Sequence, residues 1–125
     1  MPTQCPCGSL KPFTDCCEPY IKGLTKAPTA EALMRSRYSA YTVHDADYLY
    51  DTSAPAMHRH LTKASILNWA QSNHWVKLEI VSASTYVVEF KAFYLNSRLQ
   101  AQVHHEISSF VNQGGTWYYE DGEYK

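Results

Sequence analysis

Four cysteines lie within the first seventeen residues of this 125-residue chain, at Cys5, Cys7, Cys16 and Cys17, and no other cysteine occurs. Clustered cysteines of this kind bind a metal ion or form disulfides. The spacing favours a metal, because four thiolates complete a tetrahedral shell around Zn²⁺. Two disulfides within so short a segment would instead close small, strained loops. The sequence therefore predicts one Zn²⁺ ion on these four cysteines, and redox or disulfide chemistry is the alternative.

A zinc ion held by four thiolates has a structural role, because no position in its shell stays open for water or substrate. Segment 1–24 is too short to fold on its own core, so metal binding would supply the ordering energy. A short helix from Pro12 or Asp15 is expected to carry Cys16 and Cys17. We expect loss of the metal to disorder this segment and leave the remaining chain folded. Thiolates must stay reduced to bind metal, which indicates a cytoplasmic protein.

His104 and Glu106 form a second candidate group, because residues two apart on a strand share a face. A carboxylate beside an imidazole can act as an acid–base pair. The competing interpretation is a polar pair with a purely structural role. His105 points to the opposite face and cannot join His104 on one metal.

Two arginines on one expected helix complete this group. Arg35 and Arg37 lie about 200° apart around a helix, so they face different surroundings. One of them can point inward toward a carboxylate such as Glu106, although structural networks produce such pairs too. The candidate pocket residues are Arg35, Arg37, Tyr38, Tyr41, His104 and Glu106.

Helical spacing and capping residues predict the elements that position these groups. One helix begins near Thr29, a short one covers 46–51 behind a capping Asp45, and another covers 62–72. The second half of the chain changes to strand patterns rich in β-branched and aromatic residues. The four predicted strands are 75–82, 86–94, 99–111 and 116–120. Helices that precede consecutive strands indicate an α+β fold, with the helices packed on one face of an antiparallel sheet.

The N-terminal run CPCGS at 5–9, followed by the cysteine pair at 16–17, resembles the SEC-C zinc motif. Leu10 stands where SEC-C motifs usually have a second glycine, and Lys11 is the one basic residue between the two cysteine pairs. This departure weakens any transfer of charge-driven partner binding from other SEC-C proteins.

The run LMRSRYSAY at 33–41, the run DADYL at 45–49 and the run GTWYYEDG at 115–122 resemble the YchJ-like family of bacterial proteins. The resemblance implies a nuclear-transport-factor-2-like domain over 25–125, behind a zinc knuckle over 1–24. Such a domain is a cone, in which a curved four-stranded antiparallel sheet wraps around helices and encloses a pocket. The resemblance assigns no biochemical role.

Composition narrows the function classes. A hydrophobic content of 45% with 18% charged residues describes a folded domain, and a formal net charge of −1 gives nucleic acid or an anionic membrane no basic surface to bind. No apolar run approaches the ~20 residues that span a bilayer. The strong metal signal and the lack of an equally strong catalytic signal favour a zinc-binding protein-interaction module that is not an enzyme. The alternative is a small-molecule-binding protein or enzyme that uses the cone pocket through His104, Glu106 and either Arg35 or Arg37.

Overall fold

The helices begin at residues whose side chains cap them. In the computed structural model, which describes residues 3–59 and 61–125, Thr29 Oγ1 accepts a hydrogen bond from the Ala32 amide at 3.0 Å. Asp45 and Thr62 cap the next two α-helices in the same way. The helical elements are the 3₁₀ helix Phe13–Asp15, α1 (Glu18–Ile21), α2 (Ala30–Thr42), α3 (Ala46–Asp51), the 3₁₀ helix Pro55–Arg59 and α4 (Lys63–Ser72). The three helices expected after residue 28 are confirmed.

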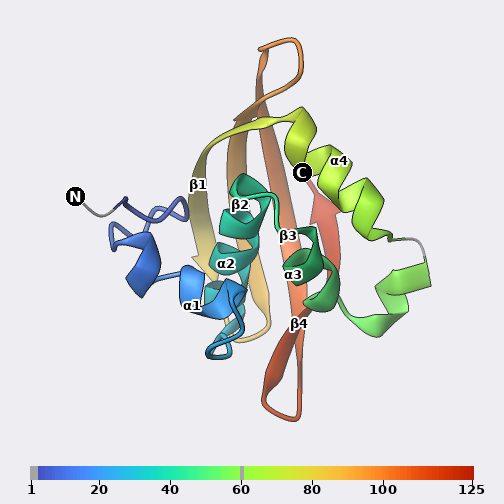
Figure 1. Cartoon of the computed structure of the whole chain (residues 1–125). Coiled ribbons are helices and arrows are strands. Elements are labelled where there is room, and N and C mark those ends of the chain that lie inside the picture. The colour runs from blue at the N-terminus through green and yellow to red at the C-terminus, as the bar shows by residue number, and fades with distance from the viewer. Residues whose placement is uncertain (1–2, 60) are drawn as a thin grey trace.

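Four strands follow and pair in chain order as an antiparallel meander. They are β1 (His74–Ala83), β2 (Val87–Leu95), β3 (Ala101–Gln113) and β4 (Thr116–Tyr124). Irregularities in register interrupt the β1–β2 ladder twice and the β3–β4 ladder once. Such bulges bend a sheet, and Figure 1 shows the resulting curvature around the helices. The α+β class and the four-stranded sheet are confirmed.

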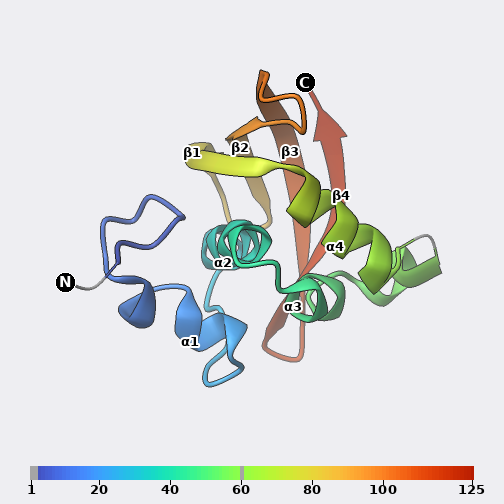
Figure 2. The same cartoon turned by 45° about the horizontal axis from the view of Figure 1, so that its top comes forward.

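Helix α2 lies against the concave face of this sheet, with α3 and α4 beyond it, as the tilted view in Figure 2 shows. Alternation along β2 buries Val88, Phe90 and Ala92 against the helices. Tyr86, the first residue of the predicted strand 86–94, precedes β2 and is 57% exposed, with its ring beside that of Trp117.

The N-terminal segment folds back on itself before it reaches α1. Cys5 donates its amide to the Lys11 carbonyl at 2.8 Å, and Phe13 donates to Thr3 at 2.9 Å. Cys16 and Cys17 follow the 3₁₀ helix and precede α1, with Cys17 at its N-cap, so the expected helix that carries both cysteines does not form. The first two residues of the predicted knuckle lie outside the described residues.

The knuckle shares the core of the larger domain. Cys5, Cys7 and Cys17 are buried in one cluster with Leu33 of α2 and Leu78 of β1. Within the described residues, no helix is both long enough and apolar enough to span a bilayer.

Candidate functional site

The sulfur atoms of Cys5, Cys7, Cys16 and Cys17 all lie within 4.8 Å of one another. The Cys7–Cys16 and Cys16–Cys17 separations are 3.6 and 3.9 Å. A tetrahedron of sulfurs with metal–sulfur bonds of ~2.3 Å has edges of about 3.8 Å, so these positions suit one tetrahedral cation. The four cysteines form a cluster that can hold a metal ion.

Protons are shared unevenly within this cluster. Hydrogen bonds from Cys17 and Cys5 lower the pKa of the Cys7 thiol. Contacts with Cys5 and Cys7, together with burial, raise the pKa of Cys17. Four closely packed sulfurs do not all ionise without a compensating cation, and a bound divalent ion supplies that charge.

Helix α2 holds the knuckle in place. Arg35 Nη1 donates to the Cys7 carbonyl at 2.8 Å, while its Nε donates to Glu31 at 2.9 Å. One turn further along, Ser39 Oγ lies 3.4 Å from Cys5 Sγ. These contacts place Arg35 beside the cysteine cluster and outside the cavity between helices and sheet, into which the sequence analysis placed either Arg35 or Arg37. The helical angle between the two arginines explains their separation.

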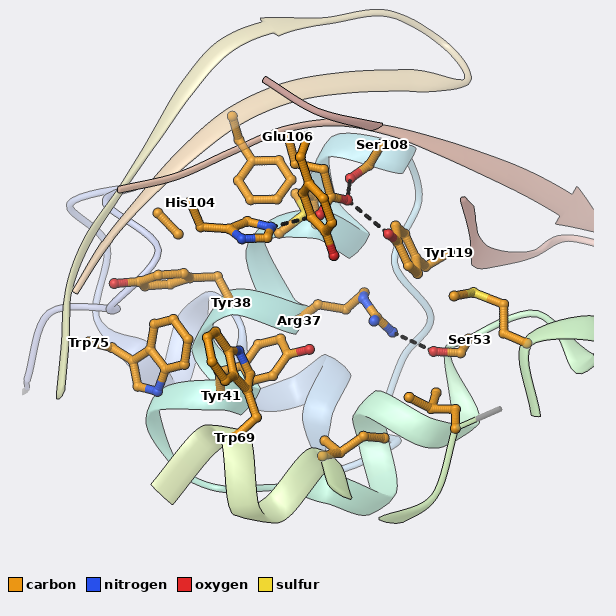
Figure 3. Close-up of a pocket in the computed structure, with 17 residues that line it drawn as sticks. Arg37, Tyr38, Tyr41, Ser53, Trp69, Trp75, His104, Glu106, Ser108 and Tyr119 are labelled. Atoms are coloured by element: carbon orange, nitrogen blue, oxygen red, sulfur yellow. Dashed lines mark hydrogen bonds and ion pairs between the residues drawn. The ribbon is translucent and has the colours of Figure 1, made fainter. Parts of the chain in front are cut away.

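A cavity of about 580 Å³ lies between the concave face of the sheet and the helices. It receives five of the six residues named from sequence, namely Arg37, Tyr38, Tyr41, His104 and Glu106. Its remaining lining is Met34, Ser53, Met57, Leu61, Ile66, Trp69, Trp75, Phe90, Ala92, Ser108, Tyr119 and Tyr124. The walls are thus aromatic and aliphatic, and the polar groups gather at few points (Figure 3).

Glu106 is the centre of one polar group. Its Oε1 lies 2.7 Å from His104 Nε2, and its Oε2 accepts hydrogen bonds from Ser108 Oγ and, at 2.8 Å, from Tyr119 Oη. His104, Glu106 and Ser108 alternate along β3, while Tyr119 comes from the neighbouring strand β4. Glu106 is 5% exposed, and each of its carboxylate oxygens has a hydrogen-bond donor.

Charge at this group follows from its hydrogen bonds. Burial alone would raise the pKa of Glu106, but hydrogen bonds from His104, Ser108 and Tyr119 outweigh it and lower this pKa. Burial, followed by the charge of Glu106, raises the pKa of Tyr119. Near neutral pH the site therefore contains an ionised carboxylate and a neutral phenol, and the carboxylate is a weak base.

Arg37 is the second polar group, and it is 6% exposed. Its Nη1 donates to the Leu49 carbonyl at 2.9 Å, to Thr52 Oγ1 at 2.7 Å and to Ser53 Oγ at 3.4 Å. The guanidinium carbon lies 4.7 Å from the centre of the Tyr119 ring. Within the described ranges no carboxylate lies in ion-pair distance of Arg37, so the suggested pair with Glu106 does not form.

The sequence did not single out several cavity residues. Trp69 and Trp75 are two of them. They form one wall with the predicted Tyr41, whose ring centre lies 5.3 Å from that of Trp75. These residues come from α4, β1 and α2, and only the tertiary fold brings them together. Ser108 had a local signal, because it continues the alternation of His104 and Glu106 along one strand face.

Gly122 of β4 makes room for the Glu106 group. A methyl group built on its Cα would collide with the Glu106 carboxylate and the Tyr119 hydroxyl. Here glycine is needed for space, because its backbone is not in the left-handed region.

A family model described as the YchJ middle NTF2-like domain matches residues 29–122, and the SEC-C motif matches residues 1–19. The chain belongs to the YchJ-like family. The family assignment made from the sequence runs is thereby confirmed, and the four-cysteine cluster lies within the SEC-C match.

Curated relatives in this family carry the name UPF0225 protein, which assigns no role. One from Geobacter sulfurreducens is 38% identical, over 98% of this chain and 80% of the relative. Another from Actinobacillus succinogenes is 39% identical, over 97% of this chain and 82% of the relative.

Solved structures of family relatives have the same fold. The solution structure of a SEC-C motif containing protein from Rhodopseudomonas palustris has a TM-score of 0.89 and 34% identity, over 97% of this chain and 98% of the other. The crystal structure of a SEC-C motif containing protein from Psychrobacter arcticus has a TM-score of 0.82 and 35% identity, over 95% and 81%. The NTF2-like fold with an N-terminal cysteine knuckle is therefore the fold of this chain.

Proposed function

We propose that the protein binds a small organic molecule in the central cavity, and that Zn²⁺ on the four cysteines has a structural role. The cavity carries this proposal, because a volume of about 580 Å³ with aromatic walls and a few convergent polar groups is typical of a ligand site. The ordered Glu106 group and the buried Arg37 supply fixed polar positions that can orient a ligand.

The structural role of zinc rests on the burial of its ligands. Cys7 and Cys17 are 0% and 1% exposed, and four sulfurs complete the shell of a zinc ion. Zinc is proposed over other metals because thiolate ligands in tetrahedral arrangement suit it best. Free, closely packed thiols also support the proposal of a reducing cytoplasmic compartment.

Protein docking at the knuckle is the second candidate. The observation in its favour is Leu10, whose side chain is 76% exposed next to the metal cluster. Phe13 and Tyr20, the aromatic residues of the same segment, offer less surface to a partner, since both side chains are half-buried and Phe13 packs on the core. The cavity therefore ranks above the knuckle as the functional site, although the sequence favoured the opposite order.

Binding can be tested by screening small aromatic and aliphatic fragments against isotope-labelled protein by NMR. We expect fragment-induced shifts at the indole N–H signals of Trp69 and Trp75, whose rings line the cavity. Ala92→Leu adds bulk to the cavity lining and should reduce fragment affinity at least tenfold.

Ala101→Leu is the matched control, because Ala101 is exposed on β3 outside the cavity lining. Fragments that bind elsewhere, or that bind Ala92→Leu as well as wild type, would refute a ligand cavity. If no fragment binds, and if Leu10→Ser abolishes the capture of a partner protein, protein docking at the knuckle is favoured instead.

A further inference from the structure

Arg37 is a cation with one side of its guanidinium engaged. Arg37 makes three hydrogen bonds to described residues, and Nη1 is the donor in all of them. The acceptors lie at the end of α3 and in the turn that follows it. Nε and Nη2 have no hydrogen-bond partner among residues 3–59 and 61–125. Every fully buried polar side-chain atom in these ranges has a hydrogen-bond partner. Because Nε and Nη2 of Arg37 have none, they are not fully buried, and they are accessible from the cavity that Arg37 lines.

The carboxylate in the same cavity is not available to neutralise this cation. Both oxygens of Glu106 accept hydrogen bonds from His104, Ser108 and Tyr119. The Tyr119 ring lies beside the guanidinium, and its hydroxyl donates to Glu106, so Tyr119 contacts both groups (Figure 3). A buried cation without a paired anion is costly, and a bound anion would remove that cost.

We propose that the cavity ligand is an organic carboxylate with a planar apolar body, and that Arg37 binds its carboxylate through Nε and Nη2. This inference rests on the proposed ligand-binding function and specifies its substrate class. Adjacent Nε–H and Nη2–H groups form the fork that matches the two oxygens of a carboxylate.

The aromatic wall accounts for the planar body. Trp75 has its ring centre 5.3 Å from that of Tyr41, 6.3 Å from that of Trp69 and 6.2 Å from that of Tyr38. Rings in such tilted and edge-on arrangements offer faces and edges to a flat apolar group. The same helix, α2, supplies Arg37, Tyr38 and Tyr41, which fixes the distance between the charged end and the aromatic end of the site.

A cationic ligand held by the aromatic rings is the main competing class. It would need an exposed carboxylate for its charge, and Glu106 already accepts three hydrogen bonds. A cation would also enter a cavity that contains the charge of Arg37. The arrangement therefore favours an anion.

The test compares three probes of similar shape and different charge, namely phenylacetate, phenylacetamide and phenethylammonium. Affinities are measured on the zinc-loaded full chain by NMR titration or calorimetry at one pH and ionic strength. We expect phenylacetate to bind at least tenfold more tightly than phenylacetamide, and phenethylammonium to bind most weakly. We also expect phenylacetate, and not phenylacetamide, to shift the Nε–H signal of Arg37.

Two variants extend the test. Arg37→Lys keeps the charge and loses the fork, so phenylacetate affinity should fall about tenfold. Arg37→Gln should abolish the preference for the anion over the amide. Circular dichroism establishes whether each variant is folded, and if neither folds, the wild-type probe series and the Arg37 Nε–H signal decide.

The outcomes separate this inference from the function on which it rests. Equal binding of the three probes in the cavity, or tighter binding of phenethylammonium, would overturn the carboxylate assignment and leave a ligand cavity. Failure of all three probes and of the wider fragment screen to reach Trp75 would overturn both.

Discussion

At the scale of single residues, Glu106 shows how local hydrogen bonds outweigh burial. Burial of Glu106, which is 5% exposed, would by itself raise its pKa, yet donors on both of its oxygens lower this pKa. The same three donors hold the carboxylate in one orientation. Each of them would lose its acceptor if Glu106 were removed. Glu106 therefore stabilises this end of the cavity when ionised.

We expect Glu106→Gln to lower the free energy of unfolding at pH 7 by about 1–3 kcal/mol, because the amide cannot accept from all three donors. The lowered pKa of Glu106 makes its contribution fully present above the unfolded-state value of about 4.3, and it is lost as pH falls through the folded-state pKa. The difference between wild type and variant should therefore shrink below about pH 4. Urea unfolding at several pH values checks this.

Glu120→Gln is the control, since Glu120 is exposed on the same strand as Tyr119. A constant difference between wild type and Glu106→Gln from pH 7 to pH 3 would show that folding does not lower the pKa of Glu106.

Leu10 is strained for a reason visible in the motif. It occupies the position of the usual second glycine and has a φ of 70°, in the left-handed region that disfavours non-glycine residues. Leu10→Gly should stabilise the folded protein by up to about 1 kcal/mol, because relief of this strain exceeds the entropy that glycine loses on folding. Thermal unfolding measures the change.

Leu24→Gly provides the comparison, because Leu24 is similarly exposed and does not have a positive φ. This second substitution should be neutral or destabilising. A stability gain of equal size in both variants would rule out backbone strain as the cause.

At the scale of elements, α2 separates the two sites. Arg35 and Ser39 lie four residues apart on the face that contacts the knuckle, and Arg37 and Tyr41 lie four residues apart on the face that lines the cavity. Strand β4 then closes the polar end of the cavity through Tyr119 and Gly122.

Gly122→Ala should destabilise the protein by about 1–3 kcal/mol, because the added methyl group displaces the Glu106 carboxylate and the Tyr119 hydroxyl. We expect shifts of the Tyr119 and His104 side-chain signals by NMR and a lower midpoint of thermal unfolding. Glu120→Ala, at an exposed site on the same strand, should leave both nearly unchanged. Unaltered His104 signals in Gly122→Ala would show that the strand accommodates the methyl group by itself.

At the scale of the whole molecule, the knuckle and the larger domain share one core. Cys5, Cys7 and Cys17 are buried with Leu33 and Leu78, and Phe13 packs against the same cluster. The sequence alone suggested an independent segment whose loss would leave the rest folded. The shared core predicts a stronger coupling.

Removal of the proposed zinc ion by a chelator should therefore lower the unfolding temperature of the entire chain, on the order of 10 °C. We expect one shifted transition, with α-helix and β-sheet signals that melt together. Cys7→Ser should behave like the metal-free protein, whereas Ser9→Ala, which loses a contact to Cys16 and no metal ligand, should shift the transition less. A fully folded larger domain with an unchanged melting temperature would restore the independent-segment interpretation.

The sequence by itself determined the three α-helices after residue 28, the four strands and the grouping of the cysteines. Caps such as Thr29 and Asp45 act on adjacent backbone, and alternation along β2 places Val88, Phe90 and Ala92 on one face whatever lies across from them. The four cysteines are close in the chain, so their convergence needed no long-range information.

Only the tertiary structure decided which arginine enters the cavity and what that cavity contains. The 200° between Arg35 and Arg37 is a property of any helix, but the rotation of α2 on the sheet selects Arg37 for the interior. Trp69, Trp75 and Tyr119 come from three separate elements, and their meeting depends on sheet curvature and helix packing. Sheet curvature and helix packing arise from contacts between segments that are distant in the chain, and no local pattern in the sequence encodes such contacts.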